Sequence, residues 1–261
     1  MPRLKRRQNQ QSGRANGLLH LRSALFLIWF IVVSLVAHIA TLPFLFFRRK
    51  FTARAARCWA KLCLWGLRVF AGLSYEVRGG RNFIHGPVLI ASKHQSMWET
   101  MAFMALLDDP AVVIKRELLS IPFYGWFARK AEMIAIDRKA GGGAIRTMLA
   151  EARKALSEGR PLLIFPEGTR KAVGASPDYK PGIAGLYTEL EVPCVPVALN
   201  SGLYWVAGGL IKKPGTIVVE FLETIPPGLP RQEFMRTLET RTETATSRLV
   251  EEGKNALAAK A

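Results

Sequence analysis

Residues 87–100 read PVLIASKHQSMWET, a largely apolar run of six residues followed by a polar loop and the start of a helix. The run PVLIAS has the unbroken hydrophobicity of a strand that is buried on both faces. Ser96 and Glu99 have the S-x-x-E form of a capping box, which predicts a helix start directly after the loop. A strand that leads through a short loop into a helix is typical of α/β proteins.

The same alternation continues through the rest of the chain. The predicted strands are YEVRG, AVVIK, MIAIDR, PLLIFP, VPCVPVAL and TIVVEFLE, at residues 75–79, 111–115, 133–138, 161–166, 192–199 and 216–223. The predicted helices cover residues 97–107, 124–129, 144–158, 183–190 and 232–259. Several strands are apolar throughout, so we expect an α/β fold with a mostly parallel sheet flanked by helices.

The N-terminal 75 residues differ from the rest of the chain in charge. They contain no acidic residue and 13 of the 37 basic residues, whereas the remaining chain carries 24 basic against 20 acidic residues. The net charge of +17 is therefore concentrated at one end. Because this end is also apolar and no nucleic-acid module is recognised, an anionic membrane is favoured over nucleic acid as its partner.

Residues 23–47 hold no Asp, Glu, Lys or Arg. At about 1.5 Å per residue this segment can cross a hydrocarbon core of roughly 30 Å, and it exceeds the length of a typical signal-peptide core. Basic residues flank both ends, so the orientation stays open, and Pro43 allows the alternative that the segment dips into the membrane and returns. We expect residues 1–75 to form a basic membrane anchor and residues 76–261 to form the α/β domain.

Residues 51–72 predict an amphipathic helix with a basic stripe opposite an aromatic and aliphatic one. This pattern is typical of a helix on anionic lipid headgroups, although a core-packing helix with a solvated basic face has the same pattern. The three cysteines of the chain, Cys58, Cys63 and Cys194, have neither a disulfide framework nor a metal-ligand spacing. The sequence therefore predicts no metal site and a reducing, cytoplasmic environment.

His94 and Glu99 are the candidate catalytic pair. Two residues five apart in one helix point about 140° away from each other, so a contact requires His94 to lie on the loop before the helix. In the alternative interpretation, Glu99 only caps the helix at Ser96. Of the four histidines, His94 is the best placed for a general base, because it follows a strand in a fold whose ligands bind beyond the carboxyl ends of strands. No serine-hydrolase elbow, zinc pair or phosphate loop occurs, which favours direct activation of a substrate hydroxyl.

Four blocks in order resemble the 1-acylglycerol-3-phosphate acyltransferases, also called lysophosphatidate acyltransferases, among the glycerolipid acyltransferases. His94 with Glu99 looks like the family's H-x4-D, and residues 115–138 look like its second motif. FPEGTR at 165–170 matches the third, and VPCVPVAL at 192–199 looks like the fourth. Two departures are Glu99, where the family usually has Asp, and Lys93, where it commonly has Asn.

The resemblance implies acyl transfer from acyl-CoA or acyl-carrier protein to the sn-2 hydroxyl of lysophosphatidic acid, giving phosphatidic acid for phospholipid biosynthesis. It implies His94 as the base, Glu99 as its partner, and no cofactor beyond the thioester co-substrate. The substrate-binding residues that it implies are Arg138, Glu167, Gly168, Thr169, Arg170, Lys180 and Gly182. From the cysteine usage and the basic N-terminus we expect the catalytic domain on the cytoplasmic face of the inner membrane.

Two other functions stay open. The acceptor of the same reaction can be another lysolipid, such as a lyso-ornithine lipid or a lysophospholipid. A non-catalytic membrane protein that binds lipid is the alternative from a different class.

Overall fold

A computed structural model describes residues 2–80, 86–137 and 142–259 of the chain. Its centre is a seven-stranded sheet in the order β1-β7-β6-β2-β5-β3-β4. All neighbouring strands are parallel except β6 and β7, which confirms the predicted mostly parallel sheet. The strands are β1 (Leu73–Arg78), β2 (Leu89–Ser92), β3 (Ala111–Lys115), β4 (Ile134–Ile136), β5 (Leu162–Ile164), β6 (Cys194–Leu199) and β7 (Gly215–Phe221).

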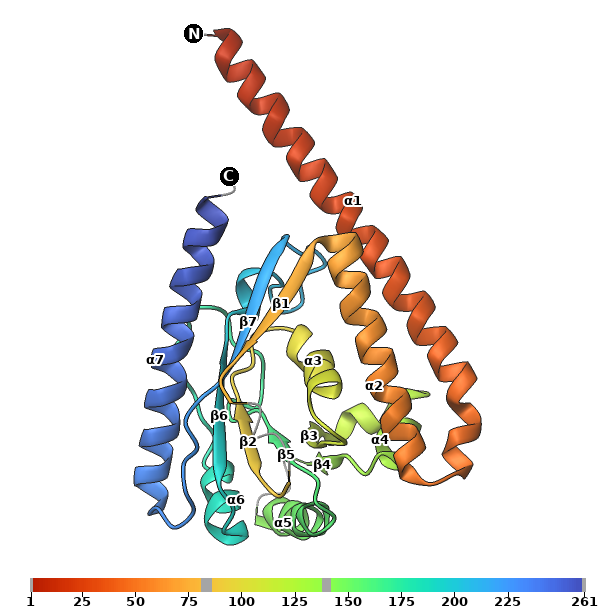
Figure 1. Cartoon of the computed structure of the whole chain (residues 1–261), viewed down its shortest axis with the longest axis vertical. Coiled ribbons are helices and arrows are strands. Elements are labelled where there is room, and N and C mark those ends of the chain that lie inside the picture. The colour runs from red at the N-terminus through yellow and green to blue at the C-terminus, as the bar shows by residue number, and fades with distance from the viewer. Residues whose placement is uncertain (1, 81–85, 138–141, 260–261) are drawn as a thin grey trace.

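Helices cover both faces of the sheet (Figure 1). On β2, Ile90 belongs to one core with α2 and α3, whereas Leu89 and Ala91 belong to a second core with α5, α6 and α7. Such alternation follows from the two-residue period of a strand. The helices are α1 (Pro2–Thr41), α2 (Arg49–Gly66), α3 (Trp98–Leu106), α4 (Tyr124–Lys130), α5 (Gly142–Ser157), α6 (Gly182–Leu190) and α7 (Arg231–Ala258).

The N-terminal region forms two helices that lie side by side (Figure 1). Pro43 lies in a short 3-10 helix, Leu42–Phe46, that separates α1 from α2. Among the described residues, one helical stretch, Asn16–Phe46, is long and apolar enough to cross a membrane. Large apolar side chains along it are exposed, among them Ile28, Ile31 and Leu35.

The predicted amphipathic helix is present as α2 and a π-helix, Leu67–Ala71. Its apolar side enters the same core as α3, since Cys63 and Leu67 cluster there with Trp98. Burial raises the pKa of the Cys63 thiol to about 12, so this cysteine is not a thiolate at neutral pH. The N-terminal helices and the α/β layers are therefore joined through shared apolar packing.

Candidate active site

The site lies where three neighbouring parallel strands end. The strands β6, β2 and β5 are adjacent in the sheet and run in the same direction, so their carboxyl ends lie at one edge. His94 follows β2, the FPEGTR loop follows β5, and Ser201 follows β6. Chemical groups from three separate parts of the chain converge there, as expected for this class of sheet.

His94 and Glu99 are in direct contact. Nδ1 of the imidazole lies 2.9 Å from Oε1 of Glu99. His94 is on the loop, and α3 begins only at Trp98, so the geometry that a five-residue spacing requires is present. Glu99 is 0% exposed and His94 is 8% exposed. A carboxylate on Nδ1 leaves Nε2 as the nitrogen that can accept a proton from a substrate.

Glu99 also reaches back to the backbone that precedes α3, as the alternative interpretation of this residue expects. The backbone N–H groups of Gln95 and Ser96 donate to its Oε1 at 2.5 and 2.6 Å. The hydroxyls of Ser96 and Ser201 donate to Oε2, each at 2.8 Å. Counting His94, five donors surround one carboxylate, which fixes its position and the tautomer of the histidine.

The charge of Glu99 is stabilised despite its burial. Burial alone would raise the pKa of this carboxyl, but the hydrogen bond and charge of His94 and the hydrogen bond from the backbone of Ser96 bring the pKa below its ordinary value. Glu99 is therefore an acceptor at neutral pH. It can stabilise an imidazolium on His94 without taking the proton itself.

We expect the contribution of Glu99 to stability to depend on pH. Because its pKa in the folded state lies below the ordinary value of 4.5, that contribution is complete above that value and is lost as pH falls through the folded-state pKa. Thermal unfolding of the native chain and of Glu99→Gln should show the largest difference in midpoint near neutral pH. The difference should shrink below about pH 4.5, and a difference that grows with acidification would contradict a lowered pKa.

Phe165 holds the imidazole from one side. Its ring is stacked on His94, with 4.2 Å between ring centroids and 22° between planes. Phe165 also lies 6.2 Å from Phe103 of the core, measured between ring centroids. The orientation of the base is therefore fixed by a hydrogen bond at Nδ1 and by an aromatic contact on its face.

The loop of residues 167–171 runs beside the histidine. The backbone N–H of Lys171 donates to the carbonyl of His94 at 2.8 Å. Gly168 has φ +65°, a left-handed conformation that favours glycine. Arg170 and Thr169 are exposed, and among the described residues Arg170 has no ion-pair partner. The neighbouring carboxylate, Glu167, pairs with Lys93 at 2.7 Å rather than with Arg170.

Of the remaining candidates for substrate binding, the structure describes Lys180 and Gly182, in the segment DYKPG at residues 178–182. The backbone N–H of Lys180 donates to the carbonyl of Pro166 at 2.9 Å, which brings the DYKPG segment to the FPEGTR loop. The Lys180 ammonium pairs with Asp178 at 2.7 Å, and Gly182 begins α6. Arg138 lies outside the described residues.

Sequence reasoning missed three side chains of the site: Ser201, Phe165 as a partner of the base, and Glu243. Ser201 could have been found, because it is the second residue after a strand that ends at the same edge. Phe165 is the first residue after β5, but nothing in its identity indicates stacking. Glu243 lies within the long helix α7 and contacts Lys93, a pairing that no local pattern indicates.

Among the described residues, no group of three His, Cys, Asp or Glu side chains is placed to hold a metal ion.

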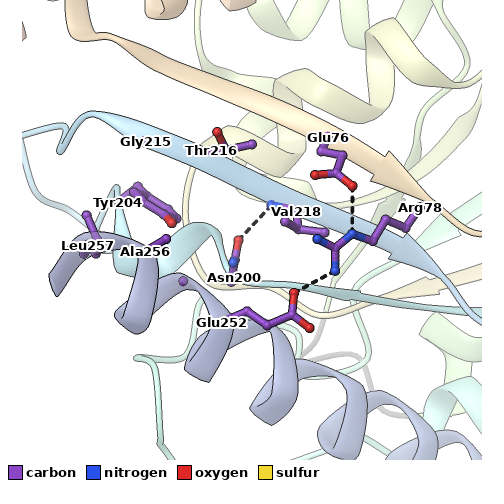
Figure 2. Close-up of a pocket in the computed structure, with 11 residues that line it drawn as sticks. Glu76, Arg78, Asn200, Tyr204, Gly215, Thr216, Val218, Glu252, Ala256 and Leu257 are labelled. Carbon is purple, nitrogen blue, oxygen red and sulfur yellow. Dashed lines mark hydrogen bonds and ion pairs between the residues drawn. The ribbon is translucent and has the colours of Figure 1, made fainter. Parts of the chain in front are cut away.

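A cavity of about 290 Å³ lies between β1, β7 and the last turns of α7 (Figure 2). Its lining includes Asn200, Tyr204 and Glu252, and neither His94 nor Glu99 contributes to it.

Comparisons with known proteins show which family this chain resembles. Residues 74–200 match the family model described as Acyltransferase. The chain is 40% identical over 177 residues to the 1-acyl-sn-glycerol-3-phosphate acyltransferase of Pseudomonas aeruginosa, with 68% of each chain covered. It is 35% identical over 143 residues to the human 1-acyl-sn-glycerol-3-phosphate acyltransferase alpha, covering 54% of this chain and 50% of the human one.

A solved structure shows the same fold. The 1-acyl-sn-glycerophosphate (LPA) acyltransferase PlsC from Thermotoga maritima superposes with a TM-score of 0.73 at 22% identity. The superposition covers 88% of this chain and 97% of the other. This likeness concerns the fold, whereas the family follows from the sequence match to the Pseudomonas enzyme. The chain belongs to the 1-acyl-sn-glycerol-3-phosphate acyltransferase family of enzymes.

Proposed function

We propose that this enzyme transfers a fatty acyl group from a thioester, acyl-CoA or acyl-carrier protein, to the sn-2 hydroxyl of 1-acylglycerol 3-phosphate. The observation that carries the proposal is the His94–Glu99 hydrogen bond of 2.9 Å at the edge of the sheet, beside the exposed Arg170 loop. The relatives named for this reaction support the choice of acceptor.

In the proposed mechanism His94 acts as a general base. Nε2 accepts the proton of the acceptor hydroxyl as its oxygen attacks the thioester carbonyl, and Glu99 stabilises the imidazolium that forms. The tetrahedral intermediate then expels the thiolate. The thiolate accepts from His94 the proton that the acceptor hydroxyl gave up, and it leaves as a thiol. The new ester bond replaces the thioester bond, and no covalent enzyme intermediate or bound cofactor is required.

The phosphate of the acceptor is proposed to bind the FPEGTR loop. The exposed Arg170 guanidinium can donate two parallel hydrogen bonds to phosphate oxygens, Gly168 allows close approach of the backbone, and the hydroxyl of the exposed Thr169 can donate a further hydrogen bond. On the family resemblance we also propose Arg138, Lys180 and Gly182 as contacts of this phosphate. Glu167 orders the loop through Lys93 rather than taking part in proton transfer.

The substrate is an amphiphile, so the proposal includes a membrane location. Residues 1–75 would attach the enzyme to an anionic leaflet, with the α/β part on the cytoplasmic face of the inner membrane. The exposed apolar side of α1 and the exposed Trp65 support this placement. The shared core with α3 would hold the active site close to that surface.

Acyl transfer from labelled acyl-CoA or acyl-carrier protein to lysophosphatidic acid, in vesicles, tests the reaction and identifies the donor. We expect product with the phosphate-bearing acceptor and much less with a lyso-ornithine lipid. Faster reaction of another lysolipid would assign the enzyme to that acceptor. Vesicle binding without any transfer would favour a lipid-binding protein and reject the proposed reaction.

Polar substitution of the exposed face of α1 should release the protein from membranes. In the variant Ile28→Gln/Leu35→Gln, two exposed apolar side chains of α1 become polar, while Phe26 and Val33 keep their core contacts. Sedimentation with anionic vesicles should fall at least about tenfold, since each substitution removes roughly 1.5–3 kcal/mol of apolar burial. Ile145→Gln, at an exposed position of α5, is the control and should sediment like the native chain. Unchanged sedimentation of the double variant would reject α1 as the anchor.

A further inference from the structure

Lys93 is a buried cation in the loop that carries the base. It is 3% exposed, and its ammonium lies 2.7 Å from a carboxylate oxygen of Glu167 and 2.7 Å from one of Glu243. A lysine is almost never this buried unless it is paired. Here the two partners come from different elements, the FPEGTR loop and α7.

Glu167 connects this cation to the backbone of the base. One of its oxygens accepts from Lys93, and the other accepts from the backbone N–H of His94 at 3.1 Å. Glu243 is held in turn by the hydroxyl of Tyr179, which donates to it at 3.0 Å. A continuous set of charged hydrogen bonds therefore joins α7 to the main chain of His94.

We propose that Lys93 and Glu243 are positioning residues of this reaction: the Lys93 ammonium, shared by Glu167 and Glu243, holds the carboxylate that fixes the His94 backbone, so that α7 contributes to alignment of the base. This inference rests on the acyl transfer proposed above. The inference assigns a role in that reaction to Glu243, which lies outside the segment 74–200 that matches the family model.

The electrostatics of the cluster support this role. Burial raises the pKa of Glu167, and the proximity of the Glu243 carboxylate adds to that rise, whereas the hydrogen bond and charge of Lys93 oppose it. The Lys93 ammonium therefore favours the ionised form of Glu167, the carboxylate that accepts from the backbone N–H of His94. Without it, two carboxylates that now share one cation would face each other without compensation.

A structural role alone would give different results, because α7 has a second set of ion pairs away from the base. Glu252 accepts from Arg78 at 2.7 Å and from Arg248 at 2.9 Å, beside the cavity in Figure 2. Like Glu243, it accepts two hydrogen bonds, and the one from Arg78 of β1 joins α7 to the rest of the molecule, whereas Arg248 lies in α7 itself. Glu252→Gln is therefore the matched control for Glu243→Gln.

The first experiment measures kcat and KM for acyl transfer well below the unfolding midpoint of each variant. We expect Glu243→Gln to lower kcat about threefold to tenfold and Lys93→Met to lower it about 30-fold or more, with KM for the acceptor within about twofold of native. Glu252→Gln should keep the native kcat. In the double variant Lys93→Met/Glu243→Gln, kcat should rise at least about threefold above that of Lys93→Met, because the uncompensated carboxylate is gone.

The second experiment does not depend on activity. The chain has four histidines, so labelling with ¹⁵N-histidine gives four backbone amide signals, and the one that His94→Gln loses belongs to residue 94. That signal should shift in Glu243→Gln and stay in place in Glu252→Gln. Because Glu243→Gln is nearly isosteric, this comparison remains decisive if Lys93→Met fails to fold.

Equal kcat values for Glu243→Gln, Glu252→Gln and the native chain, or an unshifted His94 signal in Glu243→Gln, would overturn the inference. A double variant less active than Lys93→Met would also overturn it. Failure of the reaction itself is distinguishable, since the native chain would then transfer no acyl group while the amide signal still reported the connection.

Discussion

Replacing His94 with alanine should lower kcat by about 10³-fold or more, because loss of a general base typically costs 10²–10⁴-fold. The imidazole is held by Glu99 on one nitrogen and by Phe165 on one face, so no neighbouring group can take its place without moving. The measurement is acyl transfer from acyl-CoA to lysophosphatidic acid in detergent, where attachment to a membrane does not limit the rate. KM for the acceptor should change little, since the proposed phosphate contacts lie on another loop.

The control for this variant is His20→Ala. His20 is exposed on α1, where its imidazole contacts the carbonyl of Asn16, and no contact joins it to the site in the described structure. Its kcat should equal that of the native chain. Equal rates for His94→Ala and the native chain would remove His94 from the chemistry and leave residues 93–100 as a capped helix start.

Glu99→Gln should lower kcat by roughly 10²–10⁴-fold with little change in KM, the size expected when a histidine loses the carboxylate that holds its tautomer. An amide presents its own N–H groups to a pocket that now holds five donors, so one or more of them loses its acceptor. Glu99→Asp retains the charge and should lose less activity than the amide.

Ser201→Ala separates catalysis from capping. It removes one donor to Glu99, at 2.8 Å, and leaves the His94 contact in place. We expect its kcat to fall less than tenfold, because four donors still hold the carboxylate. If Glu99→Gln were as active as Ser201→Ala, then Glu99 would act mainly as a helix cap.

Hydrophobic patterning predicted the sheet because most of its strands are buried on both faces. The strand at 111–115 was predicted with the bounds that β3 has, whereas β4 is shorter than the predicted 133–138. Strand pairing ends before Asp137. A hydropathy pattern alone cannot tell whether such a polar residue is the last residue of a strand or the first residue after it. Patterning also could not decide whether α2 faces lipid or protein, since both environments select the same amphipathic stripe.

The site was predictable as far as the sheet positions it. The rule that ligands bind beyond strand ends pointed to His94 and to the FPEGTR loop, and the structure places them together. The contact of Lys93 with Glu243 joins residues 150 positions apart. Glu243 is one of several glutamates on a polar helix, and only tertiary packing distinguishes it from the others.

The stacking of Phe165 on His94 limits which acceptors can react. With one face of the ring covered and Nδ1 occupied, a hydroxyl must approach Nε2 along the edge of the ring. The same hexapeptide, FPEGTR, supplies both Phe165 and the arginine proposed to bind phosphate. Under that proposal, the length of this segment sets the separation of hydroxyl and phosphate in the acceptor, and we expect that inserting one residue between Phe165 and Arg170 would shift the preference toward a longer acceptor backbone.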